Sequence, residues 1–202
     1  MDIKKDVLIL GLDIHGKECA DIIERNGRYK LLGYISQQDD APDTFNGYPV
    51  FGGEGAIDDI PDAGLIPLHT WKSQRHIERW TTLVDPSAWI SSSAQIGRGC
   101  VIYPNCFIGA EAALSDGVFM LSGCTINHNC EIGARACFTS RVTLAGSVKI
   151  GAGSYIGQAS NIRQYITVGE RAFVGMGAVV VKDVADDTTV IGNPARPYIK
   201  TK

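Results

Sequence analysis

Large apolar residues recur at every sixth position through the second half of this 202-residue chain. Beginning at one valine and stepping by six, every position reached is large and apolar. The series is Val84, Ile90, Ile96, Ile102, Ile108, Leu114, Met120, Ile126, Ile132, Phe138, Leu144, Ile150, Ile156, Ile162, Val168, Val174 and Val180. With 45% apolar residues overall, chance gives such a series in one fixed register roughly once in a million trials. The pattern therefore predicts a repeat architecture from about Val84 to Val180.

A second register supports the first. Four residues after each large residue stands a small or β-branched one, as at Ala94, Cys100 and Val118, and glycine often follows the large residue directly. A period of six fits neither a helix nor an alternating strand. It is typical of short flat strands separated by corners, which glycine eases. We therefore expect a left-handed parallel β-helix in which three hexads form one coil, with about five to six coils in all.

The first 80 or so residues show no such repeat. Val7–Gly11 is predicted to be a buried strand, Gly16–Asn26 a helix and Tyr29–Ile35 a second strand. This order is the βαβ opening of a Rossmann-like α/β fold. The expected organisation is a small α/β domain over residues 1–82, the β-helix over 83–184 and a short C-terminal tail over 185–202.

The turn Gly11–Gly16 joins the first predicted strand to the helix. A turn aimed at a helix N-terminus can hold a phosphate on free backbone amides. Here bulky residues fill the middle of the turn, and the acidic Asp13 would repel a phosphate. A working nucleotide site and a degenerate structural loop both fit this sequence.

Four further elements are expected before the repeat. Residues 39–43 are predicted to be a solvated loop, and Gly52 and Gly53 to precede a short helix. Leu65–Leu68 is predicted to be a third strand, and His69–Trp80 a helix. His69 and His76 are assigned no role.

Composition excludes several classes of function. The net charge of −3 gives no sign of a nucleic-acid-binding surface. The apolar run Val7–Leu12 is too short for a signal peptide or a membrane span. Four of the six cysteines fall in the small register as buried residues, and none of the six forms a C-x-x-C pair that would suggest zinc. We expect reduced thiols, no metal and a cytoplasmic protein.

The predicted β-helix contains a single histidine, His128. One coil further on stands Gly146, and one coil before Asn129 stands Glu111. A glycine beside the histidine leaves room for a thioester and a backbone N–H that can hold its carbonyl oxygen. A neutral imidazole can take a proton from an attacking amine or hydroxyl. From residue type alone, an ordinary exposed histidine at a subunit contact remains the preferred interpretation.

Several motifs along the chain resemble one family. They are Leu10-Gly11 with His15-Gly16-Lys17, Val84-Asp85-Pro86-Ser87-Ala88, Asn127-His128-Asn129-Cys130-Glu131-Ile132-Gly133, Leu144-Ala145-Gly146, Gly175-Met176-Gly177-Ala178-Val179-Val180 and Gly192-Asn193-Pro194-Ala195-Arg196. Through them the chain resembles the bacterial hexapeptide-repeat sugar acetyltransferases. That family includes sialic-acid O-acetyltransferases and the N-acetyltransferases of UDP-4-amino-sugars and GDP-perosamine.

The resemblance implies a homotrimer that transfers an acetyl group from acetyl-CoA to a nucleotide-linked sugar or related monosaccharide in glycan biosynthesis. It implies that His128 is the general base and that Gly146 donates its amide to the acetyl carbonyl. The family usually has an acid at the position of Asn129. Glu111, Glu131 or a backbone carbonyl is the alternative partner for the imidazole.

The resemblance also implies residues for both substrates. Those for the donor are Cys137, where the family often has a second histidine, with Gly157, Gly175, Gly177, Ala178 and Arg196. Those for the acceptor are Gly11, Asp13, His15, Gly16, Ser36 and Asn127. The family aspartate after the second strand is replaced here by Ser36 or Gln37, so we expect an unusual acceptor.

Two other classes of function compete with this one. A zinc enzyme of the carbonic-anhydrase type needs three convergent histidines, and the repeat offers one. A non-catalytic β-helix that serves as a binding or assembly scaffold remains the alternative, because the glycine-rich loop and the acid next to the histidine are both altered. The sequence does not choose between a nitrogen and an oxygen acceptor.

Overall fold

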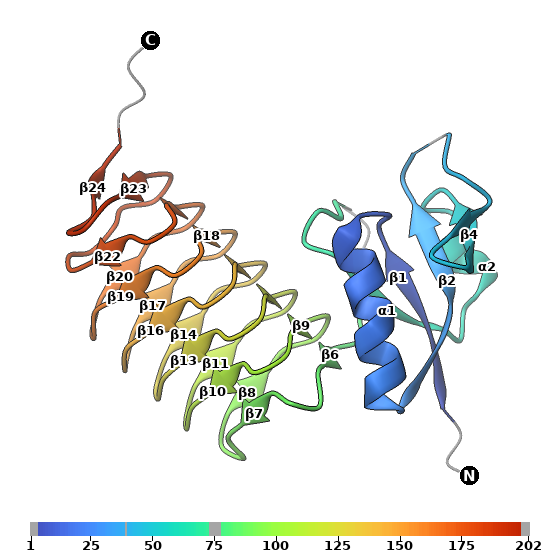
Figure 1. Cartoon of the computed structure of the whole chain (residues 1–202), viewed down its shortest axis with the longest axis horizontal. Coiled ribbons are helices and arrows are strands. Elements are labelled where there is room, and N and C mark those ends of the chain that lie inside the picture. Colours follow the sequence, from blue (N-terminus) through green and yellow to red (C-terminus); the bar gives the residue numbers. More distant parts are fainter. Residues whose placement is uncertain (1–3, 39, 73–77, 199–202) are drawn as a thin grey trace. The chain divides into compact units, whose positions relative to one another are not determined.

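The computed structural model describes residues 4–38, 40–72 and 78–198. The chain forms two compact units, Met1–Pro86 with Gly99–Val101 and Ser87–Arg98 with Ile102–Lys202 (Figure 1). The first is an α/β unit. The second is a left-handed parallel β-helix, as the six-residue period predicts.

The α/β unit is built on a five-stranded sheet in the order β3-β4-β2-β1-β5. Its strands and helices are β1 (Lys5–Leu10), α1 (Ile14–Asn26), β2 (Tyr29–Ser36), β3 (Thr44–Phe45), β4 (Tyr48–Gly52), α2 (Ala56–Asp59) and β5 (Gly64–Pro67). The pairs of β1 with β2, β1 with β5 and β2 with β4 are parallel. The predicted βαβ opening, the short helix after Gly53 and the third strand are all confirmed.

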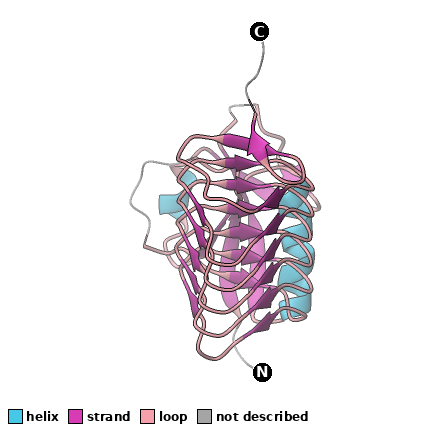
Figure 2. Ribbon diagram, turned by 90° about the vertical axis from the view of Figure 1, so that its left-hand side faces the viewer, coloured by secondary structure: helices cyan, strands magenta, loops and turns pink. Residues whose placement is uncertain are grey.

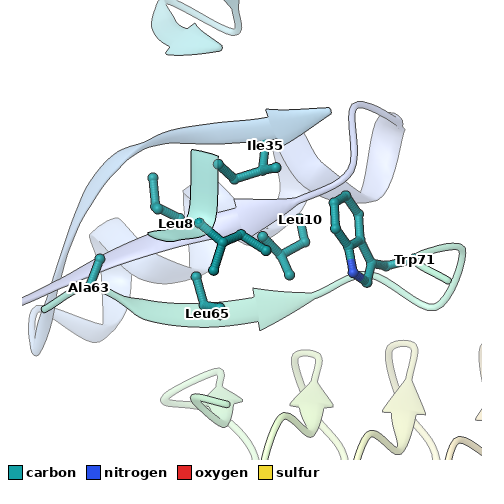
Figure 3. Close-up of a cluster of buried hydrophobic side chains, with 7 residues drawn as sticks. Leu8, Leu10, Ile35, Ala63, Leu65 and Trp71 are labelled. Atoms are coloured by element: carbon teal, nitrogen blue, oxygen red, sulfur yellow. The ribbon is translucent and has the colours of Figure 1, made fainter. Parts of the chain in front are cut away.

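The core of this unit lies around β1. The apolar residues of β1, Val7 to Leu10, are fully buried. A strand buried on both faces needs no polar residues at alternate positions, so these four apolar residues follow one another directly. Leu8 and Leu10 from β1 pack with Ile35, Leu65 and Trp71 (Figure 3). The buried Trp71 ties the chain after β5 to the same cluster.

The hairpin of β3 and β4 was not predicted. Asn46 and Gly47 form its turn with φ values of 51° and 78°. The two-residue turns typical of β-hairpins require such positive φ values. Phe45 then pairs with Tyr48, and β4 runs on beside β2. An Asn-Gly pair between apolar residues is a strong hairpin signal, so the sequence did contain the information.

The helix predicted over His69–Trp80 is wrong for the residues that the structure describes. After β5 the chain makes a turn in which the Trp71 N–H donates to the Leu68 carbonyl (2.9 Å), and Trp80 forms a bridge with Leu65. Residues 73–77, which include His76, lie outside the described residues. Burial of the Trp71 side chain holds this turn in place of a helix. Within the described ranges, no helix is both long and apolar enough to cross a membrane.

The β-helix stacks short parallel strands into three sheets (Figure 2). Its strands are β6 (Leu83–Val84), β7 (Trp89–Ile90), β8 (Gln95–Ile96), β9 (Val101–Ile102), β10 (Phe107–Ile108), β11 (Ala113–Leu114), β12 (Phe119–Met120), β13 (Thr125–Ile126), β14 (Glu131–Ile132), β15 (Cys137–Phe138), β16 (Thr143–Leu144), β17 (Lys149–Ile150), β18 (Tyr155–Ile156), β19 (Asn161–Ile162), β20 (Thr167–Val168), β21 (Phe173–Val174), β22 (Val179–Val180), β23 (Thr189–Ile191) and β24 (Arg196–Pro197). One sheet has six strands (β7 to β22), one has five (β8 to β20), and one has eight (β6 to β24).

Both registers of the repeat face the interior. From Ile102 to Val180 every large residue of the six-step series is at most 3% exposed. The cysteines of the small register are buried and are not joined in disulfides, as predicted; they are Cys100, Cys106, Cys124 and Cys130. Burial of this stacked apolar interior is what stabilises coils that have no core of their own.

The regular period ends after Val180. The next coil is two residues shorter. Phe173 pairs with Thr189, and Val168 forms a bridge with Val184. In both pairs the partners are 16 residues apart, whereas the partners on earlier coils are 18 residues apart. Strand β23 thus continues the eight-stranded sheet, and β24 folds back against it in antiparallel fashion. The segment expected as a tail, 185–202, therefore begins as part of the sheet.

Candidate functional site

His128 lies at the corner that follows β13. Its side chain is exposed, and its carbonyl accepts a hydrogen bond from the Ser147 N–H of the next coil (2.9 Å). The ring lies over Gly146: a Cβ added there would stand 2.5 Å from both Cε1 and Nε2 of the imidazole. The predicted stacking of these two residues is confirmed. Only glycine leaves space for the ring in this position.

Asn129 orients the imidazole. The His128 Nδ1 and the Asn129 Oδ1 lie 2.9 Å apart. A carboxamide oxygen can only accept, so Nδ1 is the donor in this hydrogen bond, and in a neutral imidazole this leaves Nε2 with its lone pair. Asn129 has a φ of 59°, a left-handed conformation that asparagine tolerates better than most residues. The corner thus places Nε2 of the imidazole beside Gly146.

The Gly146 N–H donates no hydrogen bond to any part of the chain that the structure describes. Its neighbours are both engaged: the Ala145 N–H donates to the Ile162 carbonyl (3.0 Å) and the Ser147 N–H to His128. A regular corner leaves this middle amide free, and here the preceding coil places an imidazole next to it. A hydrogen-bond donor and a basic nitrogen therefore stand side by side.

The other candidate partners of the imidazole are engaged elsewhere or lie apart from it. Glu131 forms an ion pair with Lys149 (3.0 Å). Glu111 is exposed one coil before Asn129, and among the described residues no hydrogen bond or ion pair joins it to His128 or Asn129. Of the partners proposed from sequence, Asn129 is the one in contact.

Asn127, expected to meet the acceptor, has a structural contact. Its Nδ2 donates to the Leu144 carbonyl of the next coil at 2.6 Å. The side chain is half-buried, so it closes the corner below His128.

The predicted donor residues lie away from His128, on the eight-stranded sheet and its corners. Cys137 is in β15, Gly157 and Gly175 follow β18 and β21, and Arg196 is in β24. Gly177, two residues after Gly175, adopts a φ of 67° with open space around it. Burial raises the pKa of the Cys137 thiol to about 11, so it stays protonated at neutral pH.

Ala178 does not line a surface channel. Its side chain is fully buried inside the β-helix, and its N–H donates to the Gly175 carbonyl (3.2 Å). The residue belongs to the small register, which already predicted an inward orientation. A donor molecule can meet this segment only through its neighbours.

The turn Gly11–Gly16 holds its own carboxylate. Asp13 is the N-cap of α1, and its Oδ1 accepts from the N–H groups of His15 (2.9 Å) and Gly16 (3.2 Å). These first-turn amides are the donors that a phosphate would need. The structure therefore favours the degenerate loop over the phosphate site, the two alternatives that the sequence left open.

Other predicted acceptor residues support the backbone of this edge. Gly11 has a φ of 124°, and a Cβ there would approach the Leu68 Cδ1 to 2.9 Å. Ser36 is buried, and its hydroxyl accepts from the Gln38 N–H (3.0 Å). Both residues shape the loops at the carboxyl ends of β1 and β2, where open α/β sheets bind ligands.

His69 was given no role from sequence, yet it lies at the same edge. Its ring makes an edge-on contact with His15, with centroids 5.2 Å apart. Burial is the main cause that lowers the pKa of His69 below its usual value, and the nearby His15 lowers it further. The signal that was missed is topological: β5 lies next to β1, so the residues after Pro67 return to the turn after Leu10.

A shallow groove of about 520 Å³ runs along the five-stranded sheet of the β-helix. The ion pair of Glu131 and Lys149 borders it, and His128 is not among its lining residues. Within the described part of the chain, no three His, Cys, Asp or Glu side chains are grouped so as to hold a metal ion.

Comparison with known proteins agrees with this division of the chain. The family model described as GMPPB C-terminal domain matches residues 84–193, more than half of the chain, and the PglD N-terminal domain matches residues 6–63. The acetyltransferase domain of PglB from Neisseria gonorrhoeae is 27% identical with a TM-score of 0.84, over 96% of this chain and 100% of that one. The chain belongs to the GMPPB C-terminal domain family and is a hexapeptide-repeat sugar acetyltransferase.

Two further solved structures show similar proteins with bound ligands. The PglB domain, at 28% identity, a TM-score of 0.84 and 96% and 100% coverage of the two chains, was solved in complex with acetyl coenzyme A. PerB from Caulobacter crescentus, in complex with CoA and GDP-perosamine, shares the fold at 23% identity, a TM-score of 0.87 and 98% coverage of each chain. A comparison with curated protein sequences found no match.

Proposed function

We propose that this acetyltransferase moves the acetyl group of acetyl-CoA to an amine of a nucleotide-linked sugar, with His128 as the general base. The observation that carries the proposal is the imidazole of His128 beside the free N–H of Gly146. The complexes of PglB with acetyl coenzyme A and of PerB with CoA and GDP-perosamine support this choice of substrates.

The proposed chemistry is a direct transfer. The acceptor nitrogen attacks the thioester carbonyl and gives up a proton to Nε2 of His128, while the Gly146 N–H donates to the carbonyl oxygen as it becomes negative. Asn129 stabilises the imidazolium through Nδ1. The carbon–sulfur bond then breaks, and the proton passes from the imidazolium to the CoA thiolate. A hydroxyl acceptor would react by the same steps.

The arrangement of the donor residues supports a homotrimer. Gly157, Gly175 and Cys137 belong to the eight-stranded sheet and its corner, whereas His128 follows the six-stranded sheet. We propose that one donor meets both groups of residues by lying between two neighbouring β-helices. We propose that the pantetheine arm passes the glycine corner of one protomer to reach His128 of its neighbour, with Arg196 near the phosphates.

The test is a turnover assay with the purified chain. Acetyl-CoA is combined with a panel of UDP-, GDP- and dTDP-linked amino sugars and their hydroxyl counterparts, and free thiol is measured. Thiol release with an amino sugar is the expected result. If no acyl-CoA raises the melting temperature and no acceptor releases thiol, the chain is better described as a non-catalytic scaffold.

A further inference from the structure

The corner that carries His128 recurs on the following coils. It joins the six-stranded sheet to the five-stranded sheet, because His128 follows β13 and precedes β14. The strands that lead into this corner pair in a constant register, through Thr125, Thr143, Asn161 and Val179 on successive coils. Each coil therefore carries the corner about 4.8 Å further along the axis of the β-helix.

Two exposed cations stand on this corner, on the C-terminal side of His128. Arg163 follows β19, two coils beyond β13, and Lys182 follows β22, three coils beyond β13. Among the residues that the structure describes, neither side chain has a partner in a hydrogen bond or an ion pair. The nearby carboxylate of Asp183 instead accepts from the Thr167 N–H at 2.8 Å. Two positive charges are thus left for a ligand.

An exposed aromatic ring belongs to the same surface. Tyr165 is 73% exposed and has a φ of 65°. The corner imposes this conformation, since Asn129 and Ser147 on earlier coils both have a φ of 59°. A bulky side chain is strained in the left-handed region, and such strain clusters at functional sites. We refer to Arg163, Tyr165 and Lys182 as the basic corner.

The basic corner lies one donor arm away from the base. About thirteen bonds separate the thioester sulfur of acetyl-CoA from its first phosphorus, which is the length of roughly four extended residues, or about 14 Å. Three coils place Lys182 on the order of 14 Å from His128 along the axis. Arg163 is one coil nearer and has a long side chain. A donor whose thioester lies at His128 can therefore bring its diphosphate to both cations.

The other side of the same corner does not suit a phosphate. There the shallow groove of the five-stranded sheet is lined toward its C-terminal end by Glu170 and Asp186. The adjoining Arg171 is already paired with Glu170 (2.8 Å) and Asp187 (2.7 Å). A phosphate in this groove would face carboxylates whose only adjoining cation is engaged. The charges therefore favour a donor on the side of the six-stranded sheet.

We infer that Arg163 and Lys182 of the protomer that supplies His128 bind the diphosphate of the acyl donor, and that Tyr165 packs against the apolar pantoate end of its arm. The two cations are then determinants of donor affinity. The inference rests on the proposed function, which places the thioester at His128. A nucleotide-linked acceptor also carries a diphosphate, so the experiment compares the two sources.

The experiment measures the binding of CoA and dephospho-CoA to the full chain by isothermal titration calorimetry, with UDP and GDP in parallel and no acceptor present. The variants are Arg163→Gln, Lys182→Gln, the double variant and Arg163→Lys, which keeps the charge. Arg135→Gln is the matched control. Arg135 is an exposed arginine of the same β-helix, on the corner between β14 and β15 rather than on the corner of His128.

We expect the Kd of CoA and of dephospho-CoA to rise at least about tenfold in the double variant, as for the loss of hydrogen bonds to a charged group. Each single variant should lose less, and Arg163→Lys less than Arg163→Gln. Added salt should weaken CoA binding by the wild type more steeply than by the double variant. The control should bind CoA as the wild type does, and UDP and GDP should not respond to any of the substitutions.

An unchanged Kd for CoA in the folded double variant overturns the inference, as does a wild type that binds no CoA. A loss in Arg135→Gln equal to that in Arg163→Gln points to overall charge and also overturns it. Loss of UDP or GDP affinity as large as that of CoA would assign the basic corner to the acceptor instead. Failure of the proposed function would appear separately, as absence of acetyl transfer by a wild type whose CoA affinity still depends on the basic corner.

Discussion

The imidazole of His128 occupies the space in which a side chain on Gly146 would stand. A Cβ on Gly146 would come within 2.5 Å of two ring atoms, so the two residues cannot both carry side chains in these positions. The pair joins one coil to the next at an exposed corner. It brings a basic nitrogen and a free backbone N–H to one place, which is what acyl transfer requires.

The first prediction concerns Gly146→Ala. The added methyl group must displace the imidazole, because a Cβ on Gly146 would lie 2.5 Å from both Cε1 and Nε2 of the ring. We expect kcat/KM for acetyl transfer to fall at least about 100-fold, the lower end of what a positioned general base contributes, because the imidazole is moved out of place. The β-helix should remain folded by circular dichroism.

The matched control is Gly52→Ala in the α/β unit. A Cβ there meets nothing within 4 Å, so the same chemical change carries no steric conflict. This variant should keep the wild-type rate. Equal rates for Gly146→Ala and Gly52→Ala would remove the steric basis of the proposed site.

The second prediction concerns Asn129. Asn129→Gly preserves the left-handed corner, where φ is 59°, but removes the oxygen that accepts from Nδ1. We expect kcat to fall on the order of tenfold, as for other residues that orient a catalytic imidazole. Asn129→Asp places a carboxylate beside the ring and favours its protonated form. Since only the neutral ring acts as base, the acidic limb of the rate–pH profile should move to higher pH. Unchanged rates and profiles in both variants would show that Asn129 does not orient the base.

The third prediction concerns the buried Asp85, which pairs with Arg25 of α1 at 3.0 Å. Asp85 is fully buried whereas Arg25 is half-exposed, so Arg25→Met removes one charged partner from a buried carboxylate. We expect a loss of about 2 kcal/mol in the free energy of unfolding, measured by urea denaturation. Arg98→Met is the control, since its pair with Asp116 is exposed on both sides and should contribute less than about 1 kcal/mol. Equal losses in the two variants would contradict this prediction.

The fourth prediction separates direct transfer from an acyl-enzyme. The pKa of Cys137 is raised to about 11 by burial, so the thiolate forms only as the pH approaches that value. Alkylation by iodoacetamide should be slow at pH 8 and accelerate toward pH 11. Mass spectrometry after incubation with acetyl-CoA should find no acetyl group on the chain. An acetylated Cys137 that transfers its acetyl group to acceptor would contradict direct attack.

The β-helix could be predicted well from the sequence because each coil packs only against the coils directly before and after it. Each inward position, such as Ile126 or Leu144, contacts its equivalents on neighbouring coils, so a fixed period in sequence becomes a fixed position in space. The same period places Gly146 against His128, because the two residues are one coil apart. The six-residue period no longer predicts the structure beyond Val180, because the next coil is two residues shorter.

The α/β unit was less predictable because its contacts are long-range. No local pattern shows that Thr70 reaches Asp13, or that Trp71 is buried against Leu10 and so prevents a helix. The partner of His128 was also open: four candidates fitted the sequence, and only side-chain geometry selects Asn129 over Glu131, which pairs with Lys149. Tertiary contacts decided each of these cases.

The most direct test of the account is the steady-state rate of acetyl transfer by His128→Ala, measured beside the wild type with the same nucleotide-linked amino sugar. Acetyl-CoA affinity is measured in parallel, so that loss of chemistry is separated from loss of donor binding. We predict that kcat falls at least about 100-fold while the Kd for acetyl-CoA stays within about threefold of the wild type. A His128→Ala enzyme that turns over at the wild-type rate would contradict the central claim that this histidine is the general base.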